Sequence, residues 1–369
     1  MRKQINRQPY LWLGMSVSAW LGLLIRNRFA IHWRRLHIVL IVSASCLHHS
    51  ILGGFELLVF GIRIARTRVH PAPVFILGHW RSGTTLLHEL FACDQRFACP
   101  STYECLSPNH FLLTRRWMPA LLAWTLPTRR PMDNMAVGFT RPQEDEFALC
   151  LLGQPSPLEH VAFPNRNGPE DPQFDVASQS PIRQHRWQRS YMRFLKRITI
   201  AHNGNPIVLK SPPHMMRIRL LLKLFPDARF VHITRDPYEL YPSTLHLWRS
   251  MYAHHSLQKP AWDKLQERIL NMYASMHERF EQERSLIPAG HLHQVRYEEL
   301  VAAPLAVMEE TYRQLQLGDF SSTRQTMENY LDSVKDHQSN QLTVTDNERT
   351  LITRRWRHFI EQQGYEIRE

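Results

Sequence analysis

The sequence has few cysteines, and none of them is spaced for a metal site. Its 369 residues contain five cysteines and no C-x-x-C pair. Cys93, Cys99, Cys105 and Cys150 lie inside or beside apolar segments, which favours buried thiols and a reducing compartment. No repeat period is visible, which excludes collagen, coiled coils and repeat solenoids. The length allows one large α/β domain or two small ones.

Acidic residues are nearly absent from the first 70 positions. These positions hold ten Lys or Arg and one acid, Glu56, so they carry +9 of the total net charge of +12 and leave +3 for the other 299 residues. A nucleic-acid-binding surface would place its basic excess on the folded domain. The distribution therefore argues against nucleic acid as a partner. It also divides the chain into a basic apolar segment, 1–70, and a domain, 71–369.

Two apolar runs, 9–25 and 36–62, form most of the basic segment, and arginines follow each run. The second run could cross a bilayer, which needs about 20 apolar residues, but polar groups such as Glu56 are costly there. It lies too far along the chain for a signal peptide and lacks a cleavage site. Two interpretations stay open, because periodicity alone does not separate them. The helices lie on an anionic membrane surface, or they form a hydrophobic cap on the domain. On the membrane, three tryptophans would lie at the interface: Trp12, Trp20 and Trp33.

A short apolar strand at 74–77 is followed by the loop Gly78-His-Trp-Arg-Ser-Gly-Thr-Thr85 and then by a helix. Such a loop points backbone N–H groups and a helix N-terminus at one place, which suits an anion. The spacing is that of a Walker A loop, but Thr84 replaces the lysine that a nucleoside triphosphatase needs. The loop instead supplies one arginine, Arg81, and three hydroxyls: Ser82, Thr84 and Thr85. These groups suit a less charged ligand, such as a 5′-phosphate that carries a sulfonate; the alternative is an ordinary glycine turn.

Two further strands end in basic residues. Residues 206–210 finish at Lys210, and residues 229–235 finish at Arg235, with Ser243 eight positions later on the next helix. Strands that alternate with helices predict a doubly wound parallel sheet, in which ligands gather at the carboxyl ends of the strands. We therefore expect Gly78, Lys210 and Arg235 to meet at one edge. Two polar segments, 164–181 and 333–345, are expected to cover the substrate and the nucleotide.

Several motifs taken together resemble those of the sulfotransferases that use 3′-phosphoadenosine 5′-phosphosulfate, of the bacterial-type branch. They are RSGTT, LKSP, RDP with the later serine, and YEELVAAP, and the resemblance covers roughly residues 72–317. It implies a P-loop-like parallel β-sheet flanked by helices, with an extra hydrophobic helical N-terminal segment, and a donor bound without a metal. It also assigns roles to the predicted residues. The 5′-phosphosulfate would be held by Arg81, Ser82, Gly83, Thr84 and Thr85, and the 3′-phosphate by Arg235 and Ser243. Lys210 would lie beside the transferred sulfonate, where it and Arg81 would stabilise the charge that develops during transfer.

The general base is not fixed by these motifs, because Pro212 stands where cytosolic relatives carry a histidine. The protein-tyrosine branch of the family instead uses a glutamate shortly after the first helix, and Glu104, in TYECLSP, is similarly placed. By this resemblance Glu104 would accept the acceptor's proton. The Glu144 and Asp145 pair is an alternative, although acids in a first helical turn also serve as caps. His214 is the third candidate.

The predicted function is sulfonate transfer to a hydroxyl, or an amine, of a small-molecule, lipid or saccharide acceptor. A phenol or peptide hydroxyl is also compatible with the sequence. A small-molecule kinase with a P-loop and a non-enzymatic membrane-associated protein are the rival functions. We expect a cytoplasmic protein, peripheral on the inner face of the membrane.

Overall fold

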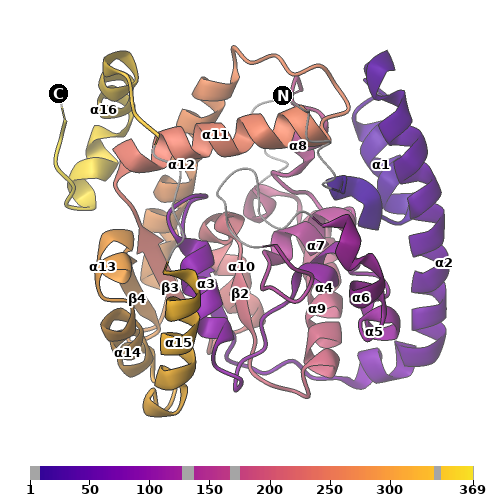
Figure 1. Cartoon of the computed structure of the whole chain (residues 1–369), viewed down its shortest axis with the longest axis horizontal. Coiled ribbons are helices and arrows are strands. Elements are labelled where there is room, and N and C mark those ends of the chain that lie inside the picture. Colours follow the sequence, from indigo (N-terminus) through magenta and orange to yellow (C-terminus); the bar gives the residue numbers. More distant parts are fainter. Residues whose placement is uncertain (1–8, 127–136, 167–174, 336–341, 369) are drawn as a thin grey trace.

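The computed structural model describes residues 9–126, 137–166, 175–335 and 342–368. Its centre is a four-stranded parallel sheet in the order β2-β1-β3-β4 (Figure 1). The strands are β1 (Val74–Leu77), β2 (Val208–Lys210), β3 (Arg229–Thr234) and β4 (Leu292–Arg296). All four residues of β1 are buried, as continuous apolar runs predict for a central parallel strand. The structure confirms the predicted fold class.

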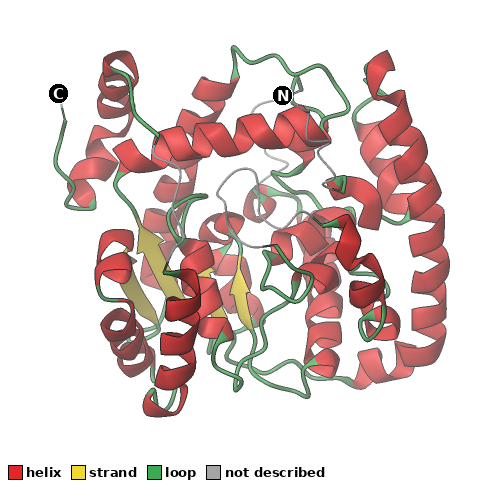
Figure 2. Cartoon of the chain, in the orientation of Figure 1, coloured by secondary structure: helices red, strands yellow, loops and turns green. Residues whose placement is uncertain are grey.

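Helices cover both faces of the sheet (Figure 2). Successive residues of β1 point to opposite faces, so Phe75 and Leu77 join one hydrophobic core and Val74 and Ile76 join the other. The larger core includes residues of α9 (Pro181–Ala201), α11 (Pro237–His255), α12 (Leu265–Glu283) and α16 (Asp346–Gln362). The smaller core packs α3 (Thr84–Ala92), α14 (Pro304–Leu315) and α15 (Ser321–Val334) against the sheet. Shorter helices complete the domain: α4 (Thr102–Leu106), α5 (Phe111–Thr114), α6 (Met118–Leu122), α7 (Asp145–Leu151), α8 (Glu159–Ala162), α10 (Ile218–Leu224) and α13 (Tyr297–Ala302).

The stretch 111–126 is not one continuous helix. It contains α5, α6 and a 3-10 turn, with Pro119 in the first turn of α6. A proline there removes a backbone donor and favours a new helix start. The predicted segments 164–181 and 333–345 each include residues outside the described part of the chain.

The N-terminal segment forms a 3-10 turn (Leu11–Gly14), α1 (Val17–Arg26) and α2 (Leu36–Arg66), which lie along one side of the domain (Figure 1). Trp12 and Trp20 are buried, so their predicted position at a membrane interface is wrong. Their indole N–H groups donate to the His255 carbonyl at 2.7 Å and to Ser43 Oγ at 3.0 Å, and these partners explain the burial. Trp33 is exposed, and its predicted position at a membrane interface stays a prediction.

A buried ion pair fixes α2 to the domain. Glu56, in the middle of the helix, accepts a hydrogen bond from Arg197 Nε of α9 at 2.7 Å, and both residues are almost fully buried. The backbone N–H of Leu113 donates to the second oxygen of Glu56 at 3.3 Å. The stretch Trp33–Arg66 is long and apolar enough to cross a membrane. However, its one acid faces the domain, so α2 packs against the protein through this part of its length.

Candidate active site

The loop between β1 and α3 is tightly built around two glycines. Gly83 has a φ of 98°, and a Cβ there would lie 2.2 Å from Cδ2 of Tyr297. A Cβ at Gly78 would lie 2.8 Å from the carbonyl oxygen of Ile233 in β3. Ser82 Oγ donates to the His79 carbonyl at 2.8 Å, which closes the turn. Only glycine allows the backbone to pass this close to its neighbours.

The helix that follows this loop begins without a cap. Gly83 precedes α3 and has no side chain to accept from its first N–H groups, and its first turn contains no acid. Thr84 is nevertheless buried. Unsatisfied N–H groups at a buried helix start, together with the positive end of the helix dipole, favour a bound anion. The loop therefore fits a phosphate or a sulfonate, as its sequence predicts.

Three of the predicted donor-binding residues meet beside the loop. Arg81 Nε donates to Ser243 Oγ at 2.8 Å, and Arg235 Nη1 donates to the Arg81 carbonyl at 3.1 Å. The guanidinium of Arg235 also lies over the ring of Tyr297, 4.5 Å from its centroid. Glu239 Oε2 lies 4.0 Å from Arg235 Nη2, at the edge of ion-pair range. The forked guanidinium groups of Arg81 and Arg235 suit a doubly charged phosphate. Tyr297 was not predicted, although it is the first residue of the YEELVAAP motif.

Lys210 lies at the end of β2 and is almost fully buried. Its Nζ donates to Glu144 Oε1 at 2.7 Å, and Glu144 is the residue that precedes α7. A buried ammonium needs a compensating charge, and Glu144 provides it. The carboxylate that contacts Lys210 thus comes from the Glu144 and Asp145 pair, the alternative to Glu104 as general base.

Asp145, next to Glu144, belongs to a closed network beneath the site. It accepts hydrogen bonds from Ser211 Oγ at 2.6 Å and Tyr191 Oη at 2.8 Å, and His214 Nε2 lies 2.8 Å from it. Burial alone would raise the pKa of Asp145, but the charge of His214 and these hydrogen bonds hold its pKa well below its usual range. Asp145 therefore stays ionised and fully bonded. It positions His214, which is fully buried.

The neighbouring acid, Glu146, forms a second buried pair. Arg217 donates two hydrogen bonds to its carboxylate, at 2.6 and 3.2 Å. The backbone N–H of Glu146 donates to Ser211 Oγ at 2.9 Å. These contacts hold the start of α7 against the segment that follows β2, and so fix Glu144 beside Lys210.

Glu104 has different surroundings. Its carboxylate accepts the backbone N–H of Ser101 at 2.8 Å, which forms a capping box at the start of α4. His202 Nε2 lies 3.1 Å from the same carboxylate, and Arg115 lies 3.6 Å from it. Burial would raise the pKa of Glu104, but the hydrogen bond from His202 and its charge lower that pKa below the ordinary value. These contacts of Glu104 support a structural role, and its predicted catalytic role stays a prediction.

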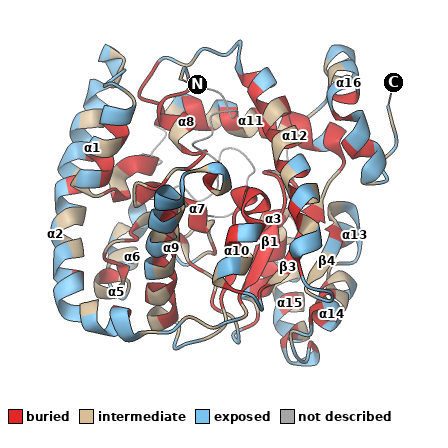
Figure 3. Ribbon diagram, turned by 180° about the vertical axis from the view of Figure 1, so that it is seen from behind, coloured by how far each residue is buried: buried red, intermediate tan, exposed pale blue. Residues whose placement is uncertain are grey.

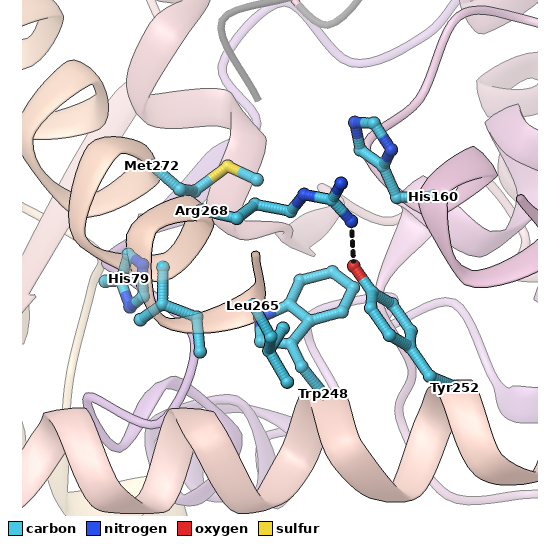
Figure 4. A pocket seen from close by; sticks show the side chains of 8 residues that line it. His79, His160, Trp248, Tyr252, Leu265, Arg268 and Met272 are labelled. Atoms are coloured by element: carbon cyan, nitrogen blue, oxygen red, sulfur yellow. Dashed lines mark hydrogen bonds between the residues drawn. The ribbon is translucent and has the colours of Figure 1, made fainter. Parts of the chain in front are cut away.

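A small cavity of about 10 Å³ lies behind the loop (Figure 4). It is lined by His79 and by residues of α8, α11 and α12, and Arg268 Nη1 donates across it to Tyr252 Oη at 2.8 Å. Burial lowers the pKa of His79 to about 4, so its imidazole is neutral at pH 7. The cavity has room for about one water molecule. It is too small for an acceptor.

Comparisons with known proteins agree with this geometry. Residues 73–322 match the sequence model of the Sulfotransferase family. The chain is 38% identical over 356 residues to the omega-hydroxy-beta-dihydromenaquinone-9 sulfotransferase Stf3 of Mycobacterium tuberculosis, with 96% of this chain and 91% of the relative covered. The Stf3 protein of Mycobacterium bovis matches to the same extent.

Solved sulfotransferase structures share the fold. STF9 from Mycobacterium avium gives a TM-score of 0.67 at 19% identity and covers 92% of this chain and 88% of its own. STF1 from Mycobacterium tuberculosis gives a TM-score of 0.59 at 18% identity, with coverages of 88% and 87%. At these low identities, the two comparisons show that the fold is shared, that is, the arrangement of helices and strands.

Proposed function

The chain belongs to the sulfotransferase family and is a sulfotransferase; we propose that it transfers a sulfonate from 3′-phosphoadenosine 5′-phosphosulfate to a hydroxyl on a long prenyl-type lipid. The named relative acts on an omega-hydroxylated dihydromenaquinone. The observation that carries the lipid assignment is the outer face of α2, which is apolar and exposed on the same body as the donor site.

The donor site divides into two parts. The loop from Arg81 to Thr85, with its uncapped helix start, would hold the 5′-phosphosulfate. Arg235 and Ser243 would hold the 3′-phosphate, and Arg81 already contacts Ser243. The forked guanidinium of Arg235 can donate to two phosphate oxygens at once.

The transfer itself needs a base and a cation beside the reacting atoms. The acceptor oxygen attacks sulfur, the bond between sulfur and the bridging oxygen breaks, and 3′,5′-adenosine bisphosphate leaves. Lys210 would stabilise the charge that develops on the bridging oxygen. We assign the proton acceptor to Glu144, because its carboxylate lies 2.7 Å from Lys210 Nζ and is therefore at the reaction centre.

The outer face of α2 supports contact with a membrane. Between Arg35 and Arg63 the helix carries one charge, Glu56, and that charge is buried. Figure 3 shows exposed residues along its outer edge. Large apolar side chains dominate this face: Leu36, Leu40, Ile41, Leu47, Ile51, Phe55, Leu57, Leu58, Val59 and Ile62. A helix of 31 residues is about 46 Å long, at about 1.5 Å per residue.

A membrane fits this face better than a second copy of the chain. Arginines flank the apolar stretch at both ends, including Arg34 and Arg35 at one end and Arg63 and Arg66 at the other. Two copies packed through α2 would bring these like charges together, whereas a bilayer offers lipid phosphates to both ends. In this proposal the enzyme is cytoplasmic and peripheral, and takes its acceptor from the inner leaflet.

The test uses the full chain with the donor labelled with ³⁵S in its sulfonate. Vesicles containing an omega-hydroxylated prenyl quinone should yield a lipid-soluble labelled product, while the same quinone without the hydroxyl should not. A soluble phenol and a saccharide serve as alternative acceptors, and labelling of these alone would refute the lipid assignment. Activity should persist in a chelator, which a kinase would not tolerate.

A further inference from the structure

A groove of about 290 Å³ runs between α2 and α9, apart from the catalytic centre. This volume is close to the lower end of small-molecule sites, about 300–1,000 Å³. The α2 wall is apolar and consists of Leu57, Gly61, Ile64 and Ala65, and Met192 adds an apolar contact from α9. Gly61 leaves this wall open, because a Cβ placed on it would meet no atom within 4 Å.

The α9 wall is basic. It contributes Arg189, Arg193 and Lys196, which recur at intervals of four and three residues and so lie on one face of the helix. The helix has six Lys or Arg and no acid. Lys196 Nζ donates to the Ala65 carbonyl at 2.9 Å and keeps further donors. Among the described residues, no carboxylate pairs with Arg189 or Arg193.

The acid of α2 does not neutralise this groove. The one acid of α2, Glu56, is buried and paired with Arg197, and neither residue lines the groove. Within the described ranges, these three cations therefore stand along an apolar wall without a carboxylate partner, at the edge of the exposed face of α2. That combination matches a ligand with an anionic head and an apolar tail.

We infer that the groove between α2 and α9 binds one anionic phospholipid. Arg189, Arg193 and Lys196 contact its phosphate, and an acyl chain lies on Leu57 and Ile64. The inference uses the membrane contact proposed above but is independent of the acceptor and of the donor site. Bound lipid would join α2 to α9 in addition to the Glu56–Arg197 pair and hold the enzyme at anionic regions of the membrane.

The first test measures binding of dihexanoyl phosphatidylglycerol, below its micelle concentration, to the full chain by calorimetry. The triple variant R189Q/R193Q/K196Q should bind it on the order of 100-fold more weakly, from about 1 kcal/mol for each basic residue. The control K223Q/K264Q/R354Q removes the same charge from exposed sites on other elements and should bind as the parent does. Equal losses in both triple variants would overturn the site. Glycerol phosphate that binds as tightly as the lipid would also overturn it, because the apolar wall would then contribute nothing.

The second test keeps every charge. Gly61→Leu fills the groove, whereas Gly54→Leu adds the same side chain elsewhere on α2, where a Cβ also meets no atom within 4 Å. Leucine favours a helix more than glycine by up to about 1 kcal/mol, so both variants should fold. Only Gly61→Leu should weaken lipid binding, by at least about tenfold; unchanged binding would overturn the proposal. Because the assay contains neither donor nor acceptor, its result is separate from that of the labelling experiment.

Discussion

The choice between Glu144 and Glu104 can be made with two isosteric variants. Glu144→Gln removes the carboxylate that lies 2.7 Å from Lys210 Nζ. Loss of a general base typically lowers turnover by about 10²–10⁴-fold. Glu104→Gln, in contrast, keeps the capping box, because glutamine also caps at this position. It loses the charge beside His202, so we expect lower stability and nearly unchanged turnover of the folded enzyme.

A lower rate in Glu144→Gln could also arise through Lys210, which would lose its counter-ion. A double-mutant cycle with Lys210→Ala separates the two causes. If Glu144 takes the proton, Glu144→Gln should slow turnover further in the Lys210→Ala background; if it only positions Lys210, the double variant should be no slower than Lys210→Ala. The measurement is single-turnover transfer at saturating donor, with calorimetry of 3′,5′-adenosine bisphosphate as the control for binding. Full activity in Glu144→Gln together with inactivity in Glu104→Gln would refute our assignment.

Three other predictions follow from the contacts described above. Arg235→Ala should weaken binding of 3′,5′-adenosine bisphosphate by about 2–4 kcal/mol, as for the loss of a buried charge partner, and unchanged affinity in calorimetry would contradict the assignment of Arg235. Glu56→Ala should destabilise the fold by about 3–5 kcal/mol, because Arg197 is left buried without a partner; Glu56→Met with Arg197→Met should recover most of this loss in urea unfolding. Burial lowers the pKa of His88, His232 and His255 to about 3 each. Below about pH 6.5 these histidines bind protons in the unfolded chain but not in the native state. The free energy of unfolding should therefore fall as the pH is lowered, by up to about 2 kcal/mol per histidine at pH 5. A free energy of unfolding that stays constant between pH 7 and 5 would contradict the lowered pKa values.

The sheet and its loop were predictable because their signals are local. Buried parallel strands appear as short apolar runs, and Gly78, Lys210 and Arg235 each follow one. The contact between Lys210 and Glu144 was not predictable in this way. It joins residues 66 positions apart, and it depends on how the start of α7 is held by Ser211 and Arg217. In sequence, Glu144 is only one of three acids at a helix start, where the helix dipole alone explains their presence.

For the N-terminal segment, the sequence does not reveal which side of its long helix packs on the domain. A helix that packs on a protein with one side and faces lipid with the other has apolar residues on both sides. Its hydrophobic periodicity therefore does not distinguish the protein-facing side from the lipid-facing side. The buried pair of Glu56 with Arg197 shows which side of α2 packs on the domain. Drawing α2 into the hydrocarbon of a bilayer would separate Glu56 from Arg197 and place a carboxylate in the hydrocarbon, where a charge costs at least about 2.5–3.5 kcal/mol. While the pair is formed, the same helix presents about ten large apolar side chains outward. The capping and membrane-surface interpretations of this segment are therefore compatible, since they concern opposite faces of one helix.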